Sequence, residues 1–97
     1  MKVWTKVIKG EKIIKDNVTP ITSVDLDSIY SVLEVICLAL DEPMPIVLAK
    51  HLNHLNEFNS TTFLPMDFVE EVAFNKMVLE IFDENITKSS PKQLPNF

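Results

Sequence analysis

Hydrophobic residues recur with a helical period between Asp25 and Leu40, the most apolar stretch of the chain. Ten of the twelve residues from Ile29 to Leu40 are aliphatic, alanine, tyrosine or cysteine. At about 100° per residue they cover well over half of the helix circumference and leave only a narrow polar strip. A helix with so little polar surface must be covered on most sides. We therefore expect the other elements to pack around it.

Two β-branched runs precede this helix, Val3–Ile8 and Ile13–Val18. Gly10 between them suits the first central position of a type II′ turn, so the pattern predicts a β-hairpin. A two-residue loop would place Lys6 opposite Lys15, an unfavourable like-charged pair unless the side chains splay into water. One hairpin face would hold Val3, Val7, Ile14 and Val18, and the other Trp4, Ile8 and Ile13. We expect the first of these faces to lie on the core.

The rest of the chain predicts one more helix and one more strand. Pro45 suits the first position of a helix from Pro45 to about Phe58, joined to the first helix as a helical hairpin. A polar break follows at 59–62, and Phe63–Val72 reads as an irregular segment with a helical turn after Pro65. Phe74–Phe82 alternates as a strand with apolar side chains on both faces, which favours a central place beside the hairpin.

These elements predict an α+β fold with a small antiparallel three-stranded sheet and a two-helix hairpin on one face, in the order ββααβ. A chain of 97 residues is long enough for one hydrophobic core. We expect a single domain at 1–84. The residues from 85 to 97 are poor in apolar side chains and contain two prolines, which predicts a flexible C-terminal tail.

The composition indicates the cellular compartment in which the protein functions. The only cysteine, Cys37, lies on the apolar arc of the first helix, so we expect a buried, inert thiol in a reducing compartment. The first residues lack the apolar segment of a signal peptide. The longest unbroken apolar run, Val35–Leu40, is far shorter than the roughly 20 residues that cross a bilayer. These observations predict a cytoplasmic protein without a membrane partner.

Charge is distributed unevenly along the chain. Residues 1–16 carry five lysines and two acids, a net of +3, whereas the whole chain carries −5. The sequence contains no arginine, the residue that base readout and bidentate phosphate recognition use most, which counts against nucleic acid as a partner. A nucleic-acid-associated regulator that uses the hairpin lysines is therefore the least favoured function, although those lysines could steer an acidic partner.

Three short motifs resemble a family of short uncharacterised proteins of Gram-positive bacteria. They are Val-Trp-x-Lys-Val-Ile at 3–8, Pro-Ile-x-Leu-x-Lys-His at 45–51 and Phe-Leu-Pro-x-Asp-Phe at 63–68, followed by an alternating strand. The resemblance extends over nearly all of 1–83. The resemblance implies one small intracellular domain, and it does not imply any particular biochemical activity.

Few residues have the spacing of a chemical site. His51 and His54 are three apart on a predicted helix, a spacing that can bind a metal, and Asp67 or Glu70 could pair with a histidine in a small hydrolase or metal-dependent enzyme. No further ligands are evident, and His51 lies on the apolar arc of its helix. We expect a structural role for His51, with its ring packed and one nitrogen hydrogen-bonded. We predict no catalytic residue, metal site or cofactor.

Apolar side chains that a domain of this size cannot all bury are more informative about function than these ionisable residues. Leu38 falls on the polar strip of the first helix, and Trp4, Ile8 and Ile13 occupy the second face of the hairpin. Apolar surface rimmed by charge often marks a contact site, for which Trp is a favoured anchor. The preferred prediction is a non-catalytic protein-interaction module that binds an unidentified protein or a second copy of itself, through either the face of Trp4, Ile8 and Ile13 or the strip that contains Leu38. In the alternative, Phe63–Val72 folds over the sheet and covers Trp4.

Overall fold

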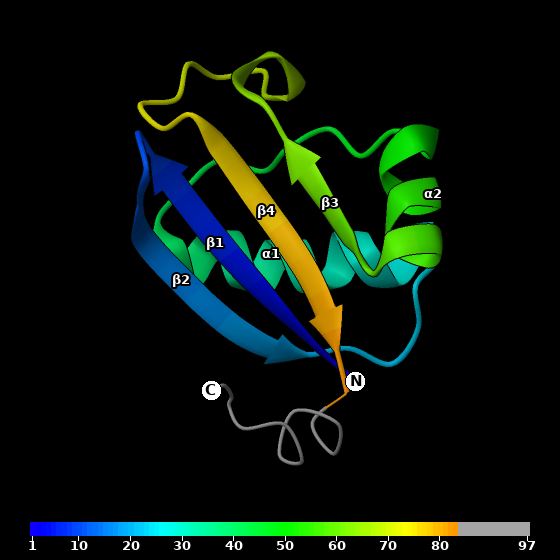
Figure 1. The fold of residues 1–97 in the computed structure, drawn as a ribbon. Coiled ribbons are helices and arrows are strands. Elements are labelled where there is room, and N and C mark those ends of the chain that lie inside the picture. Colours follow the sequence, from blue (N-terminus) through cyan, green and yellow to red (C-terminus); the bar gives the residue numbers. More distant parts are fainter. Residues whose placement is uncertain (84–97) are drawn as a thin grey trace.

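The computed structural model describes residues 1–83, which form one antiparallel sheet with helices on one face. Its elements in chain order are β1 (Lys2–Lys9), β2 (Lys12–Pro20), α1 (Leu26–Leu40), α2 (Ala49–Phe58), β3 (Ser60–Phe63), a 3₁₀ turn η1 (Pro65–Asp67) and β4 (Lys76–Phe82). The strand order is β2-β1-β4-β3, and α1 passes behind the sheet while α2 lies beside β3 (Figure 1). No helix within these residues is long and apolar enough to cross a membrane. The predicted tail at 85–97 lies outside the described residues.

The predicted three-stranded sheet is wrong, because the polar break at 59–62 contains a fourth strand. Ser60–Phe63 pairs with β4, so the element order is ββααββ. This strand is only four residues long, and Thr61 is one of its two core-facing side chains, so it lacks a hydrophobic signal. Asn59 adopts a left-handed conformation (φ 60°) between α2 and β3. The central position predicted for the last strand is confirmed, because β4 pairs with both β1 and β3.

The predicted helical hairpin is also wrong. The second helix begins at Ala49 instead of Pro45, and the eight residues between α1 and α2 form a non-helical connection. Pro45 forms an isolated β-bridge with Phe68, and the Ile46 N–H donates to the Asp67 carbonyl over 2.7 Å. This pairing holds the connection in an extended form, so α2 starts one turn later than its proline suggests.

The hairpin register differs from the predicted one because β2 contains a β-bulge. Ile8 still faces Ile13, but the next pair is Val7 with Lys15, and Ile14 has no partner in the ladder. Lys6 consequently lies opposite Asp16, so the predicted like-charged pair is replaced by an opposite-charged pair.

The bulge also turns Lys15 toward the helix side of the sheet. Its ammonium group donates to the Leu40 carbonyl and to the Glu42 carboxylate, each over 2.8 Å. A cation at this place satisfies a free carbonyl of the α1 C-terminus and suits its partial negative charge.

The core lies between the sheet and the helices. The predicted helix is confirmed: Asp25 caps its first turn by accepting from the Ser28 N–H over 2.9 Å, and α1 ends at Leu40. The buried residues of α1 include Cys37, as predicted. The sheet contributes Val3, Val7, Phe63, Met77, Leu79 and Ile81 to the same core, and α2 contributes Leu55.

Candidate functional site

The face of the sheet that points away from the helices is uncovered. In Figure 1 α1 lies behind the strands, and no described segment crosses in front of them. We call this surface the open face; it carries Lys2, Trp4, Lys6 and Ile8 of β1, Ile13, Asp16, Val18 and Pro20 of β2, Lys76, Val78, Glu80 and Phe82 of β4, and Ser60 and Thr62 of β3. Apolar and charged side chains alternate across it.

Trp4 lies near the centre of the open face and is half-buried by its neighbours. Its indole N–H donates to the Asp16 carboxylate over 3.0 Å. The Lys6 ammonium group lies 4.2 Å from the centre of the ring and 2.9 Å from a Glu80 carboxylate oxygen. Trp4 is therefore held in place by polar side chains of the open face itself. No second layer of secondary structure within residues 1–83 covers it.

The segment from 63 to 72 does not cover Trp4, contrary to the alternative drawn from the sequence. Phe68 is buried on the core side, where its ring packs edge-on against Phe74 at 5.3 Å between centroids. The η1 turn lies at one end of the sheet (Figure 1).

The four residues predicted to bind a partner lie on two separate surfaces, one for each of the predicted alternatives. Trp4, Ile8 and Ile13 share the open face, where Ile13 is 50% exposed. Leu38 is 84% exposed but belongs to α1, which lies on the other side of the sheet. The sequence prediction missed Val18, which joins the open face opposite Trp4 only because the bulge shifts the register.

His51 occupies a fully buried position at the start of α2. Its Nδ1 accepts the Leu48 N–H over 2.9 Å, which satisfies a backbone donor at the helix start, and its ring lies 4.4 Å from that of Phe63 between centroids. Nδ1 must be unprotonated to accept this bond, so the neutral ring carries its proton on Nε2. Burial lowers the pKa of His51, while the nearby Asp67 carboxylate opposes that shift.

The His51 and Asp67 side chains approach each other without an aligned hydrogen bond. His51 Nε2 lies 3.6 Å from Asp67 Oδ2, and both side chains are at least nine-tenths buried. The same Asp67 oxygen accepts the Leu64 N–H over 2.8 Å, so it caps the η1 turn. Each side chain thus serves the local backbone, and both are nearly fully buried, although His51 also lines a groove between α2 and β3.

The other members of the predicted chemical set lie apart from this pair. His54 is exposed on α2, and Glu70 is exposed near Leu38 and Asp41. Within residues 1–83 no group of three histidine, cysteine or acidic side chains could hold a metal ion. Burial, assisted by the charge of Glu42, raises the pKa of the Cys37 thiol to about 11, which removes its nucleophilic character near neutral pH.

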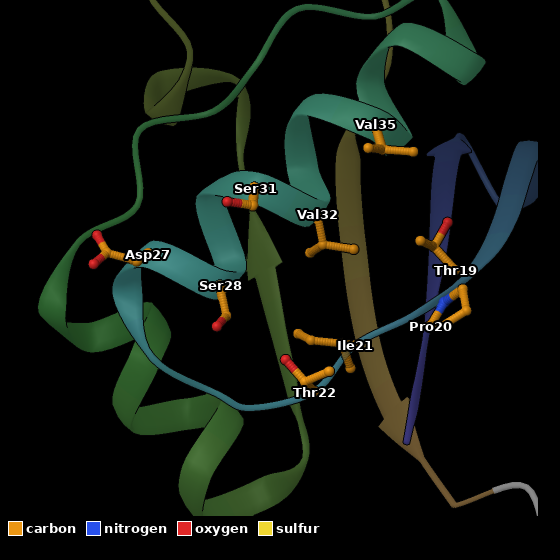
Figure 2. A pocket seen from close by; sticks show the side chains of 9 residues that line it. All are labelled: Thr19, Pro20, Ile21, Thr22, Asp27, Ser28, Ser31, Val32 and Val35. Carbon is orange, nitrogen blue, oxygen red and sulfur yellow. The ribbon is translucent and has the colours of Figure 1, made fainter.

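A hollow of about 450 Å³ lies between α1 and the end of β2. Figure 2 shows hydroxyl-bearing side chains from both walls, with the Asp27 carboxylate set apart from the hydroxyls of Thr19 and Thr22. Ser28 shares a hydrogen bond of 2.8 Å with Ser23, and Thr19 bonds to Asn17. No nucleophile is placed beside a base in this hollow.

Comparison of the chain with protein-family profiles, with curated proteins and with solved structures finds no match. Function must therefore be inferred from the geometry of the described residues.

Proposed function

We propose that this protein is a non-catalytic interaction module and that a second copy of the chain docks on its open face. One observation carries the proposal: a four-stranded sheet is covered by helices on one side only. Sheets with an apolar second face commonly bury it against another layer. Trp4, Ile8, Ile13 and Val18 supply the apolar part of that face.

The charges of the open face favour a second copy over a strongly acidic or basic partner. A twofold interface requires a self-complementary patch, because the same surface is used on both sides. Lysines on the open face (Lys2, Lys6 and Lys76) are interleaved with two acids, Asp16 and Glu80. A face that carries both signs of charge can meet its own copy without net repulsion.

The buried His51–Asp67 pair does not support the alternative of a small hydrolase. A general base must reach the proton that it removes from a substrate. His51 is instead engaged with Leu48 and enclosed by Phe63 and Asp67. We accordingly assign no catalytic role to this pair.

Sedimentation equilibrium from micromolar to millimolar concentration tests the proposal. We expect a reversible monomer–dimer equilibrium that Ile13→Lys weakens by at least about tenfold, because it places a charge in the apolar part of the interface. The matched control is Leu38→Lys, the same kind of apolar-to-lysine change at an exposed position of α1, which should leave the equilibrium unchanged. A strict monomer at millimolar concentration, or equal effects of the two substitutions, would refute the proposal.

A further inference from the structure

A second surface lies at the β3 edge of the sheet, where a groove of about 460 Å³ separates α2 from β3. Its helix wall includes Lys50, His54 and Phe58, and its strand wall includes Thr61, Thr62 and Leu64. Phe58 is 66% exposed and Leu64 is 42% exposed, so apolar side chains line it on both walls. We call it the α2–β3 groove.

The strand wall of the groove is an unpaired sheet edge. The Ile81 N–H donates to the Asn59 carbonyl over 2.7 Å, and Thr61 and Phe63 lie opposite Leu79 and Met77. Hydrogen-bonding directions alternate along an antiparallel strand. Residues 59, 61 and 63 therefore direct their backbone groups to β4, while Ser60 and Thr62 direct theirs outward, as expected of an edge strand that can accept another strand.

The groove also contains a buried polar atom that lacks a partner. Thr61 is 3% exposed and lines the groove, and its hydroxyl forms no hydrogen bond within residues 1–83. A buried hydroxyl without a partner is unfavourable.

The charge of the groove differs from that of the whole chain. None of the described residues that line the groove is acidic, whereas the chain as a whole carries a net charge of −5. Lys50 forms no ion pair with an acid of the described chain, and it stands on the helix wall opposite the strand edge. This combination favours a ligand with an acidic side chain.

We propose that the α2–β3 groove binds an extended segment of a partner protein, which adds to β3 as a strand and directs an acidic side chain toward Lys50. Main-chain hydrogen bonds to Ser60 and Thr62 would provide affinity. Lys50, His54 and the apolar residues Phe58 and Leu64 would select the side chains. The groove meets the open face along β3, where Ser60 and Thr62 belong to both surfaces, but it does not include the apolar residues Trp4, Ile8, Ile13 and Val18 on which the proposed self-association depends.

A displayed library of random ten-residue peptides is the probe. We expect the wild-type protein to enrich peptides in which acidic and β-branched residues occur together. Synthetic versions of the enriched peptides should bind with the largest amide chemical-shift changes, measured by NMR, at Ser60 and Thr62.

Two substitutions locate the binding site. Lys50→Glu should weaken peptide binding by at least about fivefold through charge reversal, and Lys50→Arg should preserve it. Thr62→Pro should weaken binding about tenfold, because it removes an outward N–H that an edge strand does not need for folding. Thr62→Ala, which retains that N–H, should bind within about twofold of the wild type.

Several results would overturn this inference. They are a library that yields no enriched peptide, shift changes confined to β1 and β2, or affinity that is indifferent to both Lys50→Glu and Thr62→Pro. A fourth is concentration-dependent movement of the Ser60 and Thr62 amides without peptide that persists in Ile13→Lys, which would assign the groove to a second copy of the chain.

Discussion

Titration of His51 should make this fold less stable as the pH falls below about 7. The unprotonated Nδ1 accepts the Leu48 N–H, and burial lowers the pKa of His51 in the folded state. A proton on Nδ1 would place two donors face to face at the start of α2. The folded protein therefore disfavours the charged ring, while the unfolded chain takes up a proton near its ordinary pKa of about 6.5.

The sign and size follow from proton linkage. The folded pKa is lower than the unfolded one, so the stabilisation is complete above the unfolded pKa and is lost as the pH falls toward the folded pKa. Between the two values the unfolded state binds about one more proton. The free energy of unfolding then falls by at most about 1.4 kcal/mol per pH unit. Attraction to Asp67 reduces this loss, because it favours the charged ring.

Urea unfolding at several pH values between 7.5 and 5 measures this effect. The slope of unfolding free energy against pH should be smaller in His51→Gln, which cannot titrate in this range. His54→Gln, a change at an exposed histidine, should retain the wild-type slope. Equal slopes in the wild type and His51→Gln, or a wild type that becomes more stable as the pH falls, would refute this account of His51.

Three further predictions concern the core and its edges. Phe63→Ala should lower the free energy of unfolding by about 3–5 kcal/mol in urea, because it opens a cavity beside His51 and removes a fully buried ring; a loss below about 1 kcal/mol would contradict that packing. Lys15→Met should cost no more than about 1 kcal/mol, measured in the same way, because the Glu42 pair is partly solvated; a larger loss would mean that the Leu40 cap matters more than we infer. Cys37, whose pKa burial raises to about 11, should react with a thiol reagent at pH 7.5 only after denaturant is added; rapid labelling of the native protein would show that the thiol is accessible.

The sequence predicted correctly those elements whose local pattern of apolar residues is compatible with only one degree of burial. The apolar arc of α1 must be buried, and the two apolar faces of β4 require neighbours on both sides, so both elements were predicted correctly. The packed ring of His51 followed from its position on the apolar arc of α2. None of these inferences required knowledge of distant contacts.

The errors share a physical cause, because each depends on a tertiary contact with no local signal. Pro45 was read as a helix start, but its pairing with Phe68 keeps the chain extended. The bulge at Ile14 lets Lys6 face Asp16 and brings Lys15 to the end of α1. Position 18 consequently changes face, which altered the predicted composition of the open face.

The strand that the sequence concealed is also the one best suited to accept another chain. As an edge strand, β3 has one free backbone side that must remain soluble, so the polar side chains of Ser60 and Thr62 are favourable there. The same polarity makes the segment read as a loop. It also leaves the outward backbone groups of Ser60 and Thr62 accessible beside the exposed Phe58 and Leu64. The weak hydrophobic signal of β3 and its proposed capacity for strand addition thus have one origin, its position at the margin of the sheet.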